Sequence, residues 1–339
     1  MLSLKAVKLG VIGPFYRILC GAVVLGSFCA FGWVLADVIR SAEGLRPNLW
    51  FALAVAVALY FFMLLFLMIL WERILIQVGT PNNHAPFPPR LRLYTAYSRS
   101  WLARYIPGRI WSLAGRTLLV NRSGVPANDV AHSVVIEVVF TYGMVTIISG
   151  SILCGAYLHP LVAIATFIVG TMFFAATLIM TGRLAVKDIS QPVDYSVIRK
   201  TLRRVANRVS GRSFFSLAFT LKGIAFYSCY SFMQLSFIVL IAAAFADLDT
   251  FAIAVIAGAW GISLTVGWLS ILPPVGLGAR DGLAFLLFSQ VIDVSSAGSI
   301  VVTSRIVMLA TDLAFVAAIE CLASGLTRIP PKIWHSRTP

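Results

Sequence analysis

The sequence predicts an all-α, polytopic membrane protein with about seven to eight transmembrane helices and two interrupted, re-entrant segments. Three observations predict this fold class. The 339 residues are 59% hydrophobic and only 12% charged, with a mean hydropathy of +0.90, whereas soluble domains carry about 25% charge. Long uncharged runs recur along the chain, and two further apolar segments are broken by proline and glycine. The bilayer is therefore the expected solvent.

The first half of the chain contains four apolar runs that are long enough to span a bilayer. They cover residues 18–36, 49–71, 131–153 and 161–182. The first follows Lys5, Lys8 and Arg17, and it is longer than the apolar region of a cleavable signal peptide. The second has tryptophan at both ends, as expected at the two headgroup levels.

The second half contains three more runs, at residues 214–246, 251–271 and 297–325. Seven spans would leave the two basic chain ends on opposite sides of the membrane. We therefore expect residues 272–292 to cross as well; the alternative is a C-terminal tail on the outer side despite its charge.

Basic loops predict the orientation. Residues 72–122 hold eight arginines against the single acid Glu72, and residues 183–212 hold eight Lys and Arg against two Asp. By the positive-inside rule both regions face the cytoplasm, as do the N-terminus and the C-terminal tail. The whole chain reads as one membrane domain, with a first half at 1–182, a basic linker at 183–212 and a second half at 213–339.

The first broken segment, residues 94–120, combines aromatic side chains with arginines. Its aromatic residues share one helical face, and Pro107 and Gly108 then interrupt the helix. We expect the segment to enter and leave the membrane on the same side. The aromatic stripe favours an interfacial anchor over a ligand cage. The stripe consists of Tyr94, Tyr97, Trp101 and Tyr105.

The second broken segment has the sequence LPPVGLGARDG, in which Pro273, Pro274, Gly276 and Gly278 precede a half-helix that begins near Ala279. Its glycines either expose backbone N–H groups to an anion or allow close helix packing. The two broken segments hold corresponding positions in the two halves, which indicates an internal repeat and places a transport site near the midplane.

Several charges fall inside these apolar segments, where each is costly and is a functional hypothesis by default. The repeat places Glu137 and Arg305 in equivalent positions and predicts an ion pair between them. Two interpretations stay open: structural pairs that fix helix register, or arginines that receive a lipid phosphate while carboxylates balance them in the empty site. The candidate headgroup ligands are Arg109, Arg116, Arg280 and Arg305, and their candidate charge partners are Glu137, Asp281 and Asp312.

Other functional classes have little support in the sequence. The five cysteines and four histidines lack metal-ligand spacing, and no nucleic-acid-binding motif accompanies the net charge of +14. Hydrolase, Walker A and metalloprotease signatures are missing. We expect neither an enzyme nor a bound metal or cofactor.

The segment SRSWLARYIPGRIWSLAGR resembles the first signature of the lysylphosphatidylglycerol synthase transmembrane region family, also called the flippase-like family. LPPVGLGARDG and the later Ser304–Arg305 pair resemble its second signature, with Val275 and Asp281 in place of the usual glycine and glutamate. The positions matched to these signatures are Tyr105, Pro107, Gly108, Arg109, Arg280, Asp281 and Arg305.

The resemblance implies a bacterial or archaeal inner-membrane protein that moves an anionic phospholipid or a polyprenyl-phosphate-linked lipid between leaflets. The synthase domain of the aminoacyl-lipid branch is missing from this sequence, so we do not expect it to make the aminoacyl lipid. A non-transporting subunit that positions a lipid-modifying or envelope-modifying enzyme is the alternative. Membrane lipids, and in that case such an enzyme, are the expected partners.

Overall fold

The computed structural model describes residues 49–79, 88–105, 110–187, 216–270 and 278–327, and these residues are helical with no strand among them. The predicted all-α class is confirmed. The predicted first span at 18–36 lies outside the described residues, as does most of the basic linker. The elements are α2 (Leu49–Val78), α3 (Arg90–Leu102), η2 (Ala103–Tyr105), α4 (Ile110–Asn121), α5 (Ala127–Tyr157), α6 (Pro160–Lys187), α8 (Leu217–Phe245), α9 (Thr250–Leu269), α10 (Ala279–Phe288) and α11 (Val294–Thr327).

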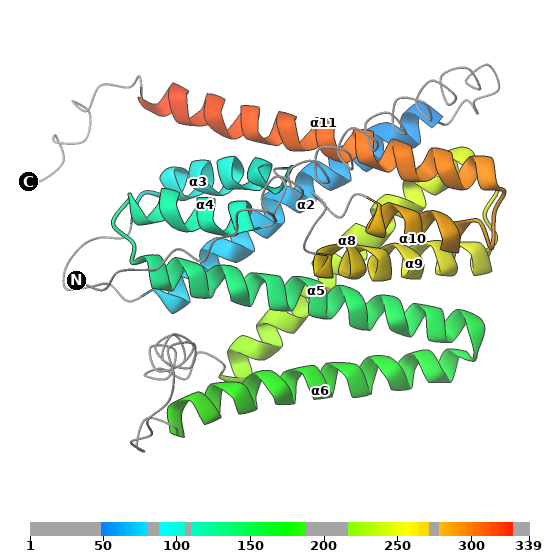
Figure 1. The fold of residues 1–339 in the computed structure, drawn as a ribbon, viewed down its shortest axis with the longest axis horizontal. Coiled ribbons are helices and arrows are strands. Elements are labelled where there is room, and N and C mark those ends of the chain that lie inside the picture. The colour runs from blue at the N-terminus through cyan, green and yellow to red at the C-terminus, as the bar shows by residue number, and fades with distance from the viewer. Residues whose placement is uncertain (1–48, 80–87, 106–109, 188–215, 271–277, 328–339) are drawn as a thin grey trace, which may run out of the picture.

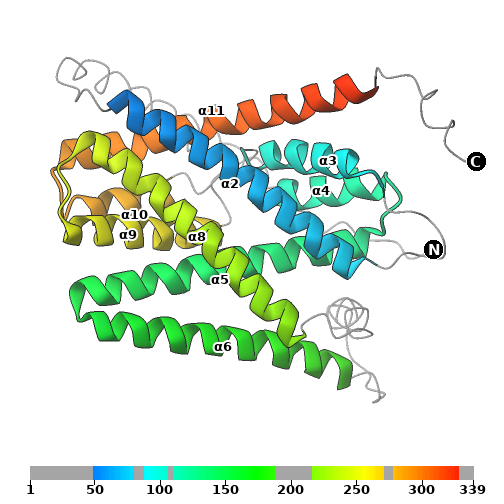
Figure 2. The same cartoon turned by 180° about the vertical axis from the view of Figure 1, so that it is seen from behind.

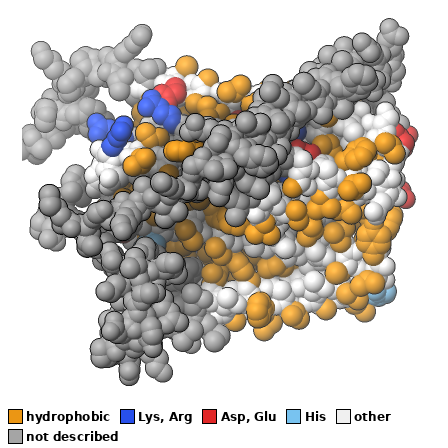
Figure 3. Space-filling model, in the orientation of Figure 1, with side chains coloured by type: hydrophobic (Ala, Val, Ile, Leu, Met, Phe, Trp, Pro, Cys, Tyr) orange, Lys and Arg blue, Asp and Glu red, His pale blue; other side chains and the backbone are white. Residues whose placement is uncertain are grey.

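Six of the described helices are long and apolar enough to cross a membrane: α2, α5, α6, α8, α9 and α11. Helix α6 carries the strongest argument, because none of the residues in its apolar window is buried inside the protein. Leu161, Ile168 and Phe173 project outward from it, and in Figure 3 hydrophobic side chains cover much of this face of the molecule. A helix this apolar with so little protein around it requires lipid as its solvent.

Two helical hairpins enter the bundle from opposite ends (Figures 1 and 2). Helices α3 and α4 lie side by side and antiparallel, so the segment begins and finishes at one end of the molecule. Helices α9 and α10 form the second hairpin, whose connections to α8 and α11 lie together at the other end. The expectation that residues 94–120 enter and leave on the same side agrees with the first hairpin.

The second hairpin contains the described part of the predicted crossing at residues 272–292, whose first residues, 272–277, lie outside the described residues. Helix α10 has ten residues, which at 1.5 Å per residue span about 15 Å, or half of a bilayer's hydrocarbon core. It packs along α9 and returns toward the end from which α9 came. The start of α9 and the end of α10 thus lie at the same end of the molecule, and α9 alone of the two helices is long enough to cross a membrane.

The two ends of the bundle differ in charge. Asp249 and Asp293 cap α9 and α11 at one end, where each carboxylate accepts a backbone N–H three residues ahead, at 2.7 and 2.8 Å. The bond from Ser296 lowers the pKa of the Asp293 carboxyl. Basic side chains lie at the opposite end, beside α3 and α11, as Figure 3 shows. This separation matches the charge pattern that the positive-inside rule describes.

Candidate functional site

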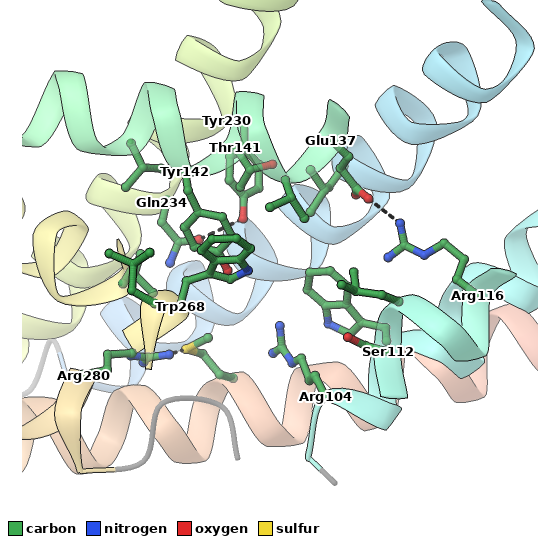
Figure 4. A pocket seen from close by; sticks show the side chains of 18 of the residues that line it. Arg104, Ser112, Arg116, Glu137, Thr141, Tyr142, Tyr230, Gln234, Trp268 and Arg280 are labelled. Carbon is green, nitrogen blue, oxygen red and sulfur yellow. Dashed lines mark hydrogen bonds and ion pairs between the residues drawn. The ribbon is translucent and has the colours of Figure 1, made fainter. Parts of the chain in front are cut away.

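A cavity of about 580 Å³ lies between the two hairpins and the long helices around them. Its wall is mainly apolar but includes three arginines and one carboxylate: Arg104, Arg116, Arg280 and Glu137. Figure 4 shows Arg116 and Glu137 on one side of the space and Arg280 on the other, with Arg104 between them. Both hairpins contribute, because Arg104 and Arg116 belong to the first and Arg280 to the second.

Asp312 of α11 is fully buried behind Arg104 and accepts hydrogen bonds from four side chains. Arg104 forms an ion pair with Oδ2, and Trp101 donates its Nε1–H to Oδ1 at 2.9 Å. The hydroxyls of Tyr105 and Tyr60 donate at 2.5 and 3.3 Å. A carboxylate that is removed from water needs hydrogen bonds and a counter-charge to offset the lost hydration, and these four side chains supply both. The aspartate ties the end of the first hairpin to α11 and, through Tyr60, to α2.

Arg116 and Glu137 form a second buried pair that joins α4 to α5. The Tyr97 hydroxyl donates to Glu137 Oε1 at 3.1 Å, and Arg116 Nε donates to Ser100 at 3.3 Å. The Arg116 guanidinium also lies 4.1 Å from the centroid of the Tyr97 ring. The guanidinium of Arg116 and the carboxylate of Glu137 therefore neutralise each other inside the protein.

Arg280 differs from the other buried arginines because it has weak partners among the described residues. Its Nη2 contacts the sulfur of Met308 at 3.3 Å, and its Nε, 3.6 Å from Asp281 Oδ1, has no hydrogen-bond acceptor there. Its guanidinium lies 4.4 Å from the ring centroid of Trp260. Thioether sulfur is a weak acceptor, so Arg280 keeps donor capacity that faces the cavity.

Backbone geometry at two glycines positions Arg280. Gly278 precedes α10 with φ +88°, a conformation that other residues rarely adopt. A Cβ there would meet nothing within 4 Å, so close packing does not explain this glycine, nor Gly282, where the same holds. A Cβ on Gly267 of α9 would lie 2.6 Å from the Cβ of Arg280. The bare backbone of Gly267 thus lets Arg280 lie tightly against α9.

Replacing Gly267 with Ala should lower the apparent melting temperature, because the new methyl group pushes against the Arg280 Cβ at the root of its side chain. Overpacking of this kind costs about 1–3 kcal/mol. Thermal unfolding in detergent would measure the shift. Gly150→Ala on α5 is the matched control, because a Cβ there meets nothing within 4 Å. Equal melting temperatures for the two variants would show that α10 is not held against α9 at this point.

Arg305 and Asp281 form a bidentate pair between α11 and α10, with Nε–Oδ1 at 2.8 Å and Nη2–Oδ2 at 2.6 Å. The expected pair between Glu137 and Arg305 is wrong, because each has another partner: Arg116 of α4 binds Glu137, and Asp281 of α10 binds Arg305. Arg305 does not line the cavity. It holds the second hairpin to α11, as Asp312 holds the first.

The interpretation of the aromatic stripe as an interfacial anchor is also wrong. Tyr97 is fully buried, and Tyr94, Tyr97, Trp101 and Tyr105 all donate hydrogen bonds to carboxylates. The acceptors are Glu72, Glu137 and Asp312. The stripe therefore satisfies buried charge within the bundle. Helical periodicity predicted that these rings share a face but not which elements that face contacts.

Several predicted site residues lie outside the described residues: Pro107, Gly108, Arg109, Pro273, Pro274 and Gly276. Of the remaining candidates, the structure places Arg116, Glu137 and Arg280 around one cavity. The candidates that do not line it are Tyr105, Gly278, Asp281, Arg305 and Asp312. Sequence reasoning missed Arg104, although it lies within the first signature, and Gln234, Tyr142 and Trp268. A polar Gln234 inside an otherwise uncharged apolar run was the signal available for that residue.

These features define a class: an all-helical protein with membrane-span-like helices and two opposed hairpins around a buried, arginine-lined cavity. No protein-family model matches the sequence, and no curated protein or solved structure matches it either.

Proposed function

We propose that the protein is a lipid translocase that moves an anionic, phosphate-bearing lipid between the leaflets of a bacterial or archaeal inner membrane. The observation that carries the proposal is Arg280, a buried arginine that lines the cavity and whose Nε has no hydrogen-bond acceptor among the described residues. The fork of N–H groups in arginine matches phosphate oxygens, and a dry surrounding strengthens the interaction.

The charges around the cavity favour an anion. Four buried or largely buried arginines (Arg104, Arg116, Arg280 and Arg305) share three carboxylates (Glu137, Asp281 and Asp312). Since Arg305 holds both oxygens of Asp281, Arg280 is the least neutralised of the four. The N-terminus of α10, one residue before Arg280, adds partial positive charge. A lipid phosphate would supply the missing negative charge.

The two hairpins suggest how the site would be exposed to each leaflet in turn. Each hairpin reaches the cavity from a different end of the molecule. Both are tied to α11 by ion pairs, through Asp312 and Arg305. Rocking of one hairpin relative to α11 would open the cavity toward that hairpin's end, as in alternating access. In this proposal the basic end faces the cytoplasm.

Transport in proteoliposomes tests the proposal. Acyl-labelled phosphatidylglycerol, with its headgroup intact, would be followed by chemical quenching of the outer leaflet, together with a polyprenyl phosphate and with neutral phosphatidylcholine. We expect exchange of at least one anionic lipid, and about tenfold or greater loss in Arg280→Gln, because a hydrogen-bonded charge pair is removed. Arg122→Gln, at an exposed arginine on the loop side of α4, is the matched control.

Arg280→Lys separates charge from geometry, because lysine keeps the charge and loses the fork. We expect it to retain part of the transport. If the folded wild-type protein moves no lipid, or if Arg280→Gln transports as well as wild type, the translocase assignment of this cavity is wrong. The first result would favour the non-transporting subunit.

A further inference from the structure

One wall of the cavity carries neutral polar groups that no ion pair explains. Gln234 of α8 is 3% exposed, yet its Nε2 has no acceptor among the described residues, and its Oε1 receives only a long 3.5 Å contact from the Tyr230 hydroxyl. The Oγ1 of Thr141 on α5 also lacks a described partner. Buried amides and hydroxyls are normally satisfied. Because both residues line the cavity, a polar ligand is the natural partner.

Two aromatic rings lie beside these groups. Tyr142 and Trp268 stack with their centroids 5.1 Å apart and an interplanar angle of 29°, and both are half-buried cavity-lining residues. In Figure 4 they lie with Gln234 on the side of the cavity where Arg280 is found, opposite Arg116. Aromatic faces carry partial negative charge and pack against C–H groups of partial positive charge. The amide and the hydroxyl can form hydrogen bonds with hydroxyl groups on the edge of a ring, and the aromatic faces can pack against the C–H groups on the ring's faces. The three kinds of group together therefore suit a polyhydroxylated ring.

The same wall disfavours a cationic headgroup. The one carboxylate that lines the cavity, Glu137, is bound by Arg116 and by the Tyr97 hydroxyl. An ammonium group on the headgroup would meet Arg104, Arg116 and Arg280 with no described carboxylate free to pair with it. Like charges in a low-dielectric cavity repel strongly. An aminoacylated lipid is therefore a poor fit for this wall.

We propose that the ligand is a lipid phosphate ester of a polyhydroxylated six-membered ring, either inositol or a hexose, with the phosphate on Arg280 and the ring against Gln234, Tyr142 and Trp268. The inference rests on the proposed function and names its substrate class. The cavity volume of about 580 Å³ falls within the range of small-molecule sites. The ring hydroxyls would satisfy the free amide of Gln234 and the hydroxyl of Thr141.

Equilibrium binding to the purified full-length protein in detergent tests this inference without requiring transport. The probes are phosphatidylinositol and a glucosyl polyprenyl phosphate, which distinguish the two sources of the ring. Phosphatidic acid serves as the ringless anion, and lysyl-phosphatidylglycerol as the aminoacylated lipid. We expect at least one ring lipid to bind about tenfold more tightly than phosphatidic acid, the size of effect that one or two added hydrogen bonds produce.

The variants Gln234→Leu and Trp268→Leu should reduce that preference to about twofold or less while phosphatidic acid binding stays unchanged, because Arg280 is intact. The matched controls are Gln290→Leu and Trp111→Leu, which change exposed residues outside the cavity lining. Melting temperatures would establish that all four variants are folded.

Two outcomes would overturn the inference. In one, phosphatidic acid or lysyl-phosphatidylglycerol binds as tightly as both ring lipids. In the other, the ring preference survives in both cavity variants. Either result leaves the translocase proposal standing if Arg280-dependent transport is observed. Conversely, ring-selective binding without transport would support this ligand class and count against translocation.

Discussion

Replacing Asp312 with Ala is expected to destabilise the protein by about 3–5 kcal/mol, the range measured when one partner of a buried ion pair is removed. Asp312 is fully buried, and its loss leaves Arg104 without its counter-charge. It also leaves the hydrogen-bonding groups of Tyr60, Trp101 and Tyr105 without this acceptor. Because these residues come from the first hairpin and α2, the hairpin should detach from α11. Denaturation in mixed micelles would measure the loss.

Glu320→Ala is the matched control for Asp312→Ala. Glu320 lies on the same helix and binds Arg99 through two hydrogen bonds, at 2.6 and 2.8 Å, but the two side chains are 35% and 58% exposed. Exposed pairs contribute about 0–1 kcal/mol. Asp312→Asn should fall between the two variants, because it keeps one acceptor oxygen and removes the charge. Equal stability of Asp312→Ala and Glu320→Ala would refute the central role of Asp312.

Breaking the Arg116–Glu137 pair from either side should be similarly costly, whereas removing both charges should restore most of the stability. Glu137→Leu leaves a guanidinium that is about 5% exposed without its carboxylate, and Arg116→Met leaves the carboxylate with only Tyr97. Each single change is expected to cost about 3–5 kcal/mol, while apolar replacements of a whole buried pair are often neutral or stabilising. Unfolding free energies of the two singles and the double would give the coupling.

The double variant also decides between two roles for Arg116. A stable double variant that still transports lipid would show that the pair only joins α4 to α5. A stable double variant that no longer transports would place Arg116 among the headgroup ligands, beside Arg280. If the double variant is as unstable as the sum of the two singles, the pair is not energetically coupled, contrary to the contact between their side chains.

Helix positions could be predicted well because they depend on local composition. The runs at 131–153 and 161–182 became α5 and α6; α5 is four residues longer at each end, and α6 is one residue longer at its start and five at its end. The Pro/Gly interruptions likewise marked the two hairpins. Whether residues 272–292 complete a crossing stays a prediction, because residues 272–277 lie outside the described residues. Composition could not show the direction of α10, which packs along α9 and returns toward the end from which α9 starts.

The site was predicted in part. Isolated charges are costly in lipid, so intramembrane charge identified the residues that need partners. These are Glu137, Arg280, Asp281, Arg305 and Asp312. The partners themselves could not be read from the chain. Asp312 meets Arg104, which is more than two hundred residues away in sequence, and the assumed symmetry suggested the wrong partner for Glu137. A loose internal repeat indicates which positions of the two halves are equivalent. Which side chains form an ion pair depends on the length of each side chain and on the rotation of each helix about its axis.

By itself, the sequence determined that lipid surrounds the protein, that the fold is all-α and which few charged residues need partners inside the bundle. Each of these follows from the free energy of transfer from water to lipid, summed over neighbouring residues. The tertiary structure alone decided that α11 holds both hairpins through Asp312 and Arg305, and that Arg280 is left with weak partners beside Gln234 and Trp268. Pairing between distant helices depends on distances and orientations of a few ångströms. Those distances are set only when all the helices pack together, and the weak pairing of Arg280 among the described residues is a result of that packing.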